Sequence, residues 1–262
     1  MDFLSFVIEK KITPRTRNLF ILPHQGLGDQ VAIYGYVAEM LKKYEIVVLV
    51  VKKKILDTLH QLYSNLNIIF YGINDDKDIS PNFGYVEKDA LFSLLQQFNF
   101  DHHFHYCHSL IPLEPLKTTI WTFIELFYRE FGLDEKLRYN FSIKRNLERE
   151  QQCFDKLVSV MGDKYAIIHD DNDRNFLLNG IFMPDLPKFF IGLGTHVNDE
   201  LKSNNVFDYI KVLESAEEIH IFDSFLAIMI DVMNLKCKGK IYFHTYLRDG
   251  DPRLYRSDFV YL

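Results

Sequence analysis

The chain has few cysteines and no long hydrophobic run, and both absences narrow the class of protein. Its three cysteines, Cys107, Cys153 and Cys237, are widely spaced and form no CxxC pair. A disulfide framework or a zinc site of paired cysteines is therefore not expected. The low cysteine content instead favours a reducing compartment. The first apolar run, residues 3–8, is too short for a signal sequence, and no stretch reaches the roughly 18 apolar residues of a membrane span. We expect a cytoplasmic protein without a membrane span.

Basic residues are too few for a protein that binds the phosphate backbone of nucleic acids without sequence specificity. Lys and Arg number 30 against 36 Asp and Glu, which gives a formal net charge of -6. Affinity for a phosphate backbone needs clustered basic side chains, so no nucleic-acid partner is expected. Aromatic residues are abundant instead, with 23 Phe and 15 Tyr. They supply core area and flat surfaces on which a base or a sugar can stack.

The first half of the chain alternates predicted strands with predicted helices. Residues 18–23 (NLFILP) are a continuous apolar run, and the turn-rich segment HQGLGDQ follows it. Apolar residues then recur every three or four positions over residues 30–43, which predicts a helix. The same reasoning predicts strands at 45–51, 67–71 and 101–107 and helices at 53–63, 88–98 and 117–131.

The alternation restarts after a polar stretch between residues 139 and 150. Strands are predicted at 165–169, 189–193, 218–222 and 240–244, with helices at 147–161, 206–216 and 224–233. Continuous Val, Ile and Leu runs are typical of buried parallel strands joined by helices. The sequence therefore predicts an α/β protein of two Rossmann-like domains, residues 1–145 and 146–262, that face a cleft.

Gly26-Leu27-Gly28-Asp29-Gln30 is the first candidate site, where a predicted strand passes into a helix. Glycines let a ligand approach the backbone, and a helix start offers free amides. The segment lacks the third glycine of GxGxxG, so a dinucleotide site is not expected. The alternative is a glycine turn in which Asp29 only caps the helix.

His169 to Arg174 (HDDNDR) is the second candidate, again after a strand. Arg174 is suited to grip a diphosphate with two hydrogen bonds, and His169 to donate to a phosphate or a ribose hydroxyl. Asp170, Asp171 and Asp173 are alternatively suited to bind Mg²⁺ or Mn²⁺. A solvated acidic turn is the third interpretation.

Asp223, Ser224 and Phe225 form the third candidate, at the start of an apolar helix. Serine is a preferred capping residue, and a helix start in a Rossmann-like half is a natural cradle for a diphosphate. Ordinary α/β structure explains the pattern as well, with the hydroxyl serving only as the cap.

Two further segments leave alternatives open. In the histidine-rich stretch 102–108, a strand would place His103, His105 and Cys107 on one face, as zinc binding requires, although hydrogen bonding or acceptor contact is the preferred interpretation. The glycine-containing stretch 192–195 either touches the donor or simply ends a strand.

The segments HQGLGDQ, IIHDDNDRNF and EIHIFDSFLAIMID occur in an order that resembles GT-B glycosyltransferases of the heptosyltransferase and fucosyltransferase-like kind. The resemblance extends over most of the chain in architecture but over only about thirty residues in motif. It implies transfer of a sugar from a nucleoside-diphosphate sugar to a hydroxyl acceptor such as a glycan. The chain is shorter than typical members of this group.

The resemblance also implies roles for particular residues. Asp29 would be the general base on the acceptor hydroxyl. Neighbouring acceptor-loop positions are Gln25, Gly26, Gly28 and Gln30. Arg174, Ser224 and the amides after Ser224 would stabilise the departing diphosphate without a metal or another cofactor. The positions that bind the donor would be His169, Arg174, Asp223, Ser224 and Phe225. No lysine lies beside Arg174, and Lys188 is a candidate for the missing positive charge.

Two other functions compete with glycosyl transfer. A noncatalytic bilobed protein that binds a nucleotide, a glycan or a protein partner would tolerate the loss of Asp29. A metal-dependent phosphotransferase or hydrolase would use the aspartates of residues 170–173, although the chain has no Walker segment of a kinase.

Overall fold

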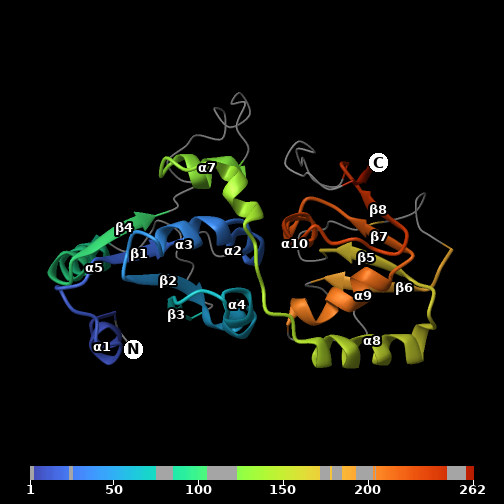
Figure 1. The fold of residues 1–262 in the computed structure, drawn as a ribbon, viewed down its shortest axis with the longest axis horizontal. Coiled ribbons are helices and arrows are strands. Elements are labelled where there is room, and N and C mark those ends of the chain that lie inside the picture. Colours follow the sequence, from blue (N-terminus) through green and yellow to red (C-terminus); the bar gives the residue numbers. More distant parts are fainter. Residues whose placement is uncertain are drawn as a thin grey trace. The chain divides into compact units, whose positions relative to one another are not determined.

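The chain forms two compact units, Met1–Ile143 and Lys144–Leu262 (Figure 1). The structure, a computed structural model, describes residues 3–23, 26–74, 85–104, 123–171, 178, 185–192, 203, 205–246 and 258–262. Each unit has its own parallel sheet and its own helices. The α/β character predicted for both halves is therefore confirmed.

The first unit is built on a four-stranded parallel sheet with the order β3-β2-β1-β4. Its strands are β1 (Asn18–Leu22), β2 (Ile46–Lys52), β3 (Ile69–Ile73) and β4 (Phe100–Phe104). Each overlaps a strand predicted from the sequence. Apolar side chains occupy both faces of β1 and β2, as they must in a parallel sheet that is covered on both sides.

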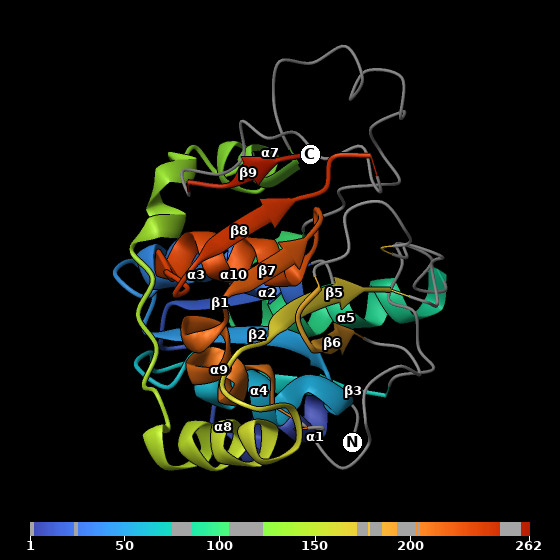
Figure 2. The ribbon, with the colours of Figure 1, turned by 90° about the vertical axis from the view of Figure 1, so that its right-hand side faces the viewer.

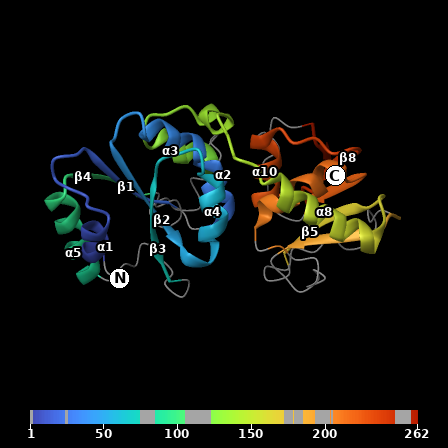
Figure 3. The same ribbon diagram turned by 60° about the horizontal axis from the view of Figure 1, so that its bottom comes forward.

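Helices cover both faces of this sheet (Figure 3). On one face lie α1 (Phe3–Glu9) and α5 (Tyr85–Gln97), and on the other lie α2 (Leu27–Ala32), α3 (Tyr34–Met40) and α4 (Leu56–Leu62), which follows the 3₁₀ turn η1 (Lys53–Ile55). The unit continues through α7 (Phe123–Arg129) and the 3₁₀ helix η2 (Glu135–Tyr139).

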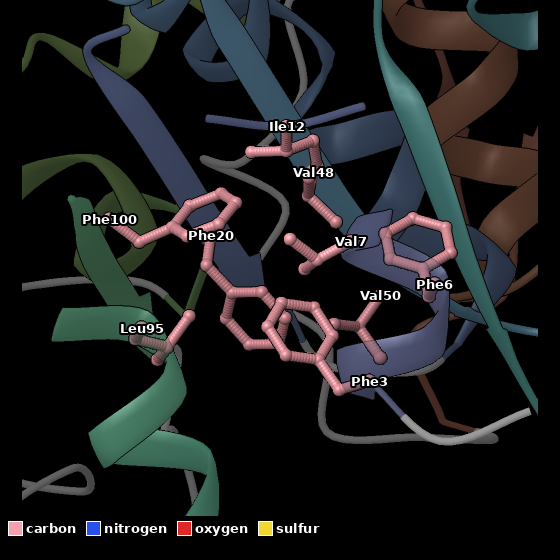
Figure 4. Packing of buried hydrophobic residues seen from close by; sticks show 9 residues of the cluster. All are labelled: Phe3, Phe6, Val7, Ile12, Phe20, Val48, Val50, Leu95 and Phe100. Carbon is pink, nitrogen blue, oxygen red and sulfur yellow. The ribbon is translucent and has the colours of Figure 1, made fainter. Parts of the chain in front are cut away.

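The helix α1 was not expected from the sequence, and tertiary packing explains it. Phe3, Phe6 and Val7 point into a core cluster with Phe20 of β1 and Phe100 of β4 (Figure 4). The rings of Phe3 and Phe20 meet edge to face, with centroids 5.1 Å apart. A two-turn helix is unstable alone, whereas each large side chain buried here contributes about 1.5–3 kcal/mol. Docking therefore holds α1 in place.

The single helix predicted over residues 30–43 is wrong, because the structure has two short helices, the first of which begins before residue 30. α2 starts at Leu27 and ends at Ala32, and α3 follows after Ile33, whose ψ is 3°. The hydroxyls of Tyr63 and Tyr128 donate to the carbonyl oxygens of Gln30 and Ala32, at 2.8 and 2.7 Å. The carbonyl groups near the break at Ile33 thus accept hydrogen bonds from tyrosines outside the helix.

The second unit is built on a five-stranded parallel sheet with the order β6-β5-β7-β8-β9 (Figure 2). Its strands are β5 (Ala166–Asp170), β6 (Lys188–Gly192), β7 (Glu218–Ile221), β8 (Lys240–Phe243) and β9 (Val260–Tyr261). The first four overlap predicted strands. The two-residue β9, which lies in the short apolar segment 259–262 and pairs with β8, was not predicted.

The helices of this unit are α8 (Leu147–Met161), α9 (Ile210–Ser215), which follows the 3₁₀ helix η5 (Val206–Tyr209), and α10 (Phe225–Met233). The prediction for α8 is confirmed at both ends. Arg145 holds α8 and α9 together, because its guanidinium donates to Glu150 at 2.5 Å and to Glu214 at 2.7 Å. The Glu150 side chain is almost fully buried. Loss of Arg145 would leave its carboxylate as an unpaired buried charge, which destabilises the fold.

Parts of three predicted elements, residues 105–107, 117–122 and 193, lie outside the described residues. In the part of the chain that the structure describes, no helix combines the length and the apolar composition needed to cross a membrane.

Candidate functional site

The candidate donor residues gather at the carboxyl ends of β5 and β7, which are neighbours in the sheet. His169 is the next-to-last residue of β5, and Ser224 and Phe225 come three and four residues after the end of β7. Carboxyl ends of parallel strands form one edge of the sheet, where α/β proteins bind ligands. Arg174 lies outside the described residues. We call this edge, with His169, Asp223, Ser224 and Phe225, the donor edge.

Ser224 occupies the N-cap position of α10, but the prediction that its hydroxyl caps the helix is wrong. Its backbone is extended, with φ -159° and ψ 176°, and its side chain makes no capping hydrogen bond. The residue is only 6% exposed, and its Oγ has no hydrogen-bond partner among the described residues. A buried hydroxyl without a hydrogen-bond partner costs free energy. A bound ligand that accepts a hydrogen bond from it would therefore stabilise the site.

The start of α10 adds a second feature at the same place. The side chain of the N-cap residue accepts no hydrogen bond from the first amides of the helix. The helix also carries partial positive charge at this end. Ser224 contributes its carbonyl, which accepts from the Ile228 amide at 3.2 Å. Amides and hydroxyl together are suited to an anionic oxygen such as that of a phosphate.

His169 is buried, and its ring contacts Ile191, Phe222 and Phe225. Its Nδ1 lies 2.5 Å from the carbonyl oxygen of Ile191, which can only accept, so Nδ1 carries a proton. The ring stacks on Phe222, with centroids 5.0 Å apart, and meets Phe225 edge to face. These contacts fix the tautomer and orient Nε2 away from Ile191.

The acidic run after His169 is described only in part. Asp170 and Asp171 are both buried, and Asp173 lies outside the described residues. Among the residues that the structure describes, no group of three or more His, Cys, Asp or Glu side chains is arranged to hold a metal ion.

The expectation that Lys188 supplies positive charge to a diphosphate at the donor edge is wrong. Lys188 is the first residue of β6, and it pairs in register with Ala166 at the start of β5. Because the strands are parallel, Lys188 lies at the amino edge of the sheet, opposite the donor edge. Gly192, at the other end of β6, does lie at the donor edge, and residues 193–195 are outside the described part of the chain.

In the first unit the GLGD segment forms the start of α2. Gly26 is the N-cap residue, and its amide donates to Asp29 Oδ2 at 3.1 Å. The structure thus contains the capping contact that the alternative interpretation of Asp29 predicts. Gly28 and Asp29 are half-buried, Gln30 is fully buried, and Gln25 lies outside the described residues.

Sequence reasoning missed two residues that position this loop. Tyr63 and Tyr128 are fully buried, and their hydroxyls bond the carbonyls of Gln30 and Ala32 in α2. They lie 33 and 96 positions away from those partners. A buried tyrosine in an apolar run suggests only that some partner exists, so no local pattern identifies which carbonyl it binds.

His103 of the histidine-rich stretch packs against helices and not with other metal ligands that the structure describes. Its Nδ1 is hydrogen-bonded to the hydroxyl of Tyr36, and its ring stacks on Phe131 with centroids 4.0 Å apart. Burial lowers its pKa to about 4, so the ring is neutral near pH 7. His105 and Cys107 lie outside the described residues.

Comparison with known proteins gives a likeness in structure. No family model and no curated protein matches the sequence. The fold is similar to that of the glycosyl transferase family 9 protein from Veillonella parvula DSM 2008, with a TM-score of 0.50 and 10% identity, over 94% of this chain and 85% of that one. At this identity the likeness concerns the fold alone, and it supports the glycosyltransferase-like α/β fold predicted from the sequence.

Proposed function

We propose that the protein is a glycosyltransferase that moves a sugar from a nucleoside-diphosphate sugar to a hydroxyl group of an acceptor such as a glycan. The observation that carries the proposal is the Ser224 hydroxyl, buried without a partner at the start of α10. Such a group favours a ligand with acceptor oxygens at the carboxyl edge of a parallel sheet. The fold likeness to a glycosyl transferase family 9 protein agrees with this assignment.

In this proposal the donor edge stabilises the negative charge of the departing nucleoside diphosphate. The Ser224 hydroxyl and the first amides of α10 would donate to phosphate oxygens, and Arg174 would add a positive charge. His169, held by Ile191 and Phe222, would present Nε2 to the ligand in a fixed direction. Charge stabilisation of this kind does not require a metal ion, so we propose a metal-independent reaction.

The first unit would supply the acceptor loop of Gln25, Gly26, Gly28 and Gln30. Asp29 would accept the proton of the acceptor hydroxyl while the new bond to the anomeric carbon forms and the bond to the diphosphate breaks. One oxygen of Asp29 accepts from the Gly26 amide. A carboxylate has several acceptor positions, so a single capping bond is compatible with this role.

A thermal-shift screen with UDP, GDP, ADP and CMP, in EDTA, tests the donor edge. We expect one nucleotide at about a hundred times its dissociation constant to stabilise the protein by roughly 5 °C. Ser224→Ala should weaken that effect severalfold. Ser159→Ala, which removes an exposed hydroxyl on α8, is the matched control and should behave as wild type.

The outcomes of this screen separate the proposals. Stabilisation that needs a divalent metal would count against the metal-independent reaction. No stabilisation by any nucleotide, or equal stabilisation of Ser224→Ala, would contradict the donor edge. Nucleotide binding without sugar transfer would favour the second candidate, a noncatalytic binding protein, which the capping contact of Asp29 also favours.

A further inference from the structure

The break between α2 and α3 contains an inserted tyrosine hydroxyl. α2 ends at Ala32 and α3 begins at Tyr34, whereas an uninterrupted helix would join the Ala32 carbonyl to the Tyr36 amide. The Ala32 carbonyl instead accepts from the Tyr128 hydroxyl of α7, at 2.7 Å. Burial raises the pKa of this hydroxyl, while hydrogen bonds that its oxygen accepts from the Tyr36 and Gly35 amides act in the opposite direction. A side chain inserted in this way is a known cause of a sharp bend in a helix.

The Tyr63 hydroxyl has the corresponding place two residues earlier in the chain. An uninterrupted helix would join the Gln30 carbonyl to the Tyr34 amide, but this carbonyl accepts from Tyr63, which follows α4, at 2.8 Å. The Tyr63 ring also stacks on Tyr34, with centroids 5.6 Å apart. Tyr63 and Tyr128 are both fully buried. The two tyrosines therefore bond the carbonyls on either side of the break, where continuous helix would have used backbone amides.

Asp29, the proposed general base, lies within the short helix that these tyrosines hold. Its carbonyl accepts from the Ile33 amide at the break, at 3.0 Å, and the next residue is Gln30, which Tyr63 bonds. α2 has only six residues, and a helix of that length is not stable alone. The direction of Asp29 therefore depends on bonds from outside the helix.

Loss of either hydroxyl would leave a buried carbonyl of α2 without this donor, which costs free energy. The carbonyl can regain a donor in two ways. It bonds a backbone amide if the break closes into continuous helix, and it bonds water if α2 opens. Either change displaces Asp29, and misplacement of a reacting group by about 1 Å can lower a rate about 10²-fold.

We propose that Tyr63 and Tyr128 are positioning residues that hold the break at Ile33 and thereby aim the Asp29 carboxylate at the acceptor hydroxyl. They act through the backbone of α2 and do not contact the substrate. The inference rests on the proposed function for the chemical role of Asp29.

Hydrolysis of a sugar donor is a suitable assay, because water takes the place of the acceptor hydroxyl and Asp29 accepts its proton. Release of the nucleotide is measured with UDP-glucose, GDP-mannose and ADP-glucose. We expect Tyr63→Phe and Tyr128→Phe each to lower kcat roughly tenfold or more. KM for the donor should stay within about twofold, because the proposed donor edge lies in the second unit.

Tyr165→Phe is the matched control for the loss of a buried hydroxyl. Tyr165 is fully buried in the second unit, and its hydroxyl donates to the Val212 carbonyl at 2.8 Å. All three variants should lower the melting temperature by similar amounts, on the order of 5 °C, but Tyr165→Phe should keep wild-type kcat. An equal loss of kcat in Tyr165→Phe would show that general destabilisation is responsible, and would overturn the inference.

Combination with Asp29→Asn tests whether the tyrosines act through Asp29. In that background Tyr63→Phe should lower kcat less than about twofold, because the base whose position it sets has already been removed. A purely structural effect of Tyr63→Phe would be as large in Asp29→Asn as in the wild type. That additive result would overturn the inference.

The same measurements distinguish failure of the inference from failure of the proposed function. Wild-type turnover that Asp29→Asn removes, but that Tyr63→Phe and Tyr128→Phe leave unchanged, would overturn the inference and leave the proposed function intact. Absence of nucleotide release by the wild type from all the donors would overturn the proposed sugar transfer, and the inference with it.

Discussion

Asp29 has a structural contact and a proposed chemical role, and single substitutions separate the two. Its carboxylate accepts from the Gly26 amide, which starts α2, and in the proposed reaction it also accepts a proton. Asp29→Asn keeps an oxygen that can cap the helix but removes the basic group. A purely structural residue would tolerate this change, and a general base would not.

We expect Asp29→Asn to lower kcat for sugar transfer by about 10²- to 10⁴-fold, because proton acceptance from the hydroxyl is lost. Nucleotide binding and the free energy of unfolding should change little. Asp57→Asn, in the first turn of α4, is the matched control for an exposed carboxylate at a helix start. Wild-type turnover by Asp29→Asn in a steady-state assay would contradict the assignment of the base.

Gly26→Ala tests whether the position of the Asp29 carboxylate matters. A Cβ at residue 26 would lie 2.4 Å from Asp29 Oδ2, so the carboxylate must move although the residue itself is unchanged. Since small misplacements of a catalytic group are costly, we expect kcat to fall on the order of 10²-fold. The measurement is the same assay, and full activity would show that the capping geometry is irrelevant to turnover.

At the scale of elements, the close approach of α3 to η2 depends on one glycine. A Cβ at Gly35 would lie 1.9 Å from the Leu137 carbonyl oxygen, and the backbone of η2 cannot rotate away as a side chain can. We expect Gly35→Ala to lower the free energy of unfolding by about 1–3 kcal/mol in urea denaturation. Gly72→Ala meets only the flexible Lys53 side chain, at 3.2 Å, and should cost much less. Equal losses would contradict this account.

Elements that depend on local pattern could be predicted, and those that depend on distant partners could not. The continuous apolar runs gave β1 and β2 to within a residue, and the amphipathic pattern gave α8 at both ends. The break at Ile33 is different, because the hydroxyls of Tyr63 and Tyr128 bond carbonyls on either side of it. The partners of these bonds are 33 and 96 positions apart, so a short stretch of sequence never contains both of them.

The candidate site shows the same division. The turn after β7 was predicted to begin a helix, and Ser224 does occupy the N-cap position. The absence of its capping bond depends on side-chain orientation, which residue type does not determine. The contact between His220 and His244 was not foreseen either, because it depends on the register that pairs β7 with β8.

At the scale of the whole molecule, each unit contains a histidine that is hydrogen-bonded to a tyrosine, partly buried in the first unit and fully buried in the second. His103 of the first unit is bonded to Tyr36, and His244 of the second to Tyr246. Burial lowers the pKa of each histidine to about 4. Both units should therefore respond to acid in the same direction, although each has its own sheet and core.

The sign of this response follows from proton binding. An unfolded histidine has a pKa of about 6.5, so between pH 6.5 and 4 the unfolded chain binds more protons than the folded one. The free energy of unfolding should fall as the pH decreases through this window, by about 2 kcal/mol from fully buried His244 between pH 7.5 and 5. Urea denaturation at the two pH values measures the loss. His244→Gln keeps a donor toward His220 but does not titrate in this range, so its loss should be smaller by about that amount. An unchanged loss in this variant would show that His244 is not held neutral by burial.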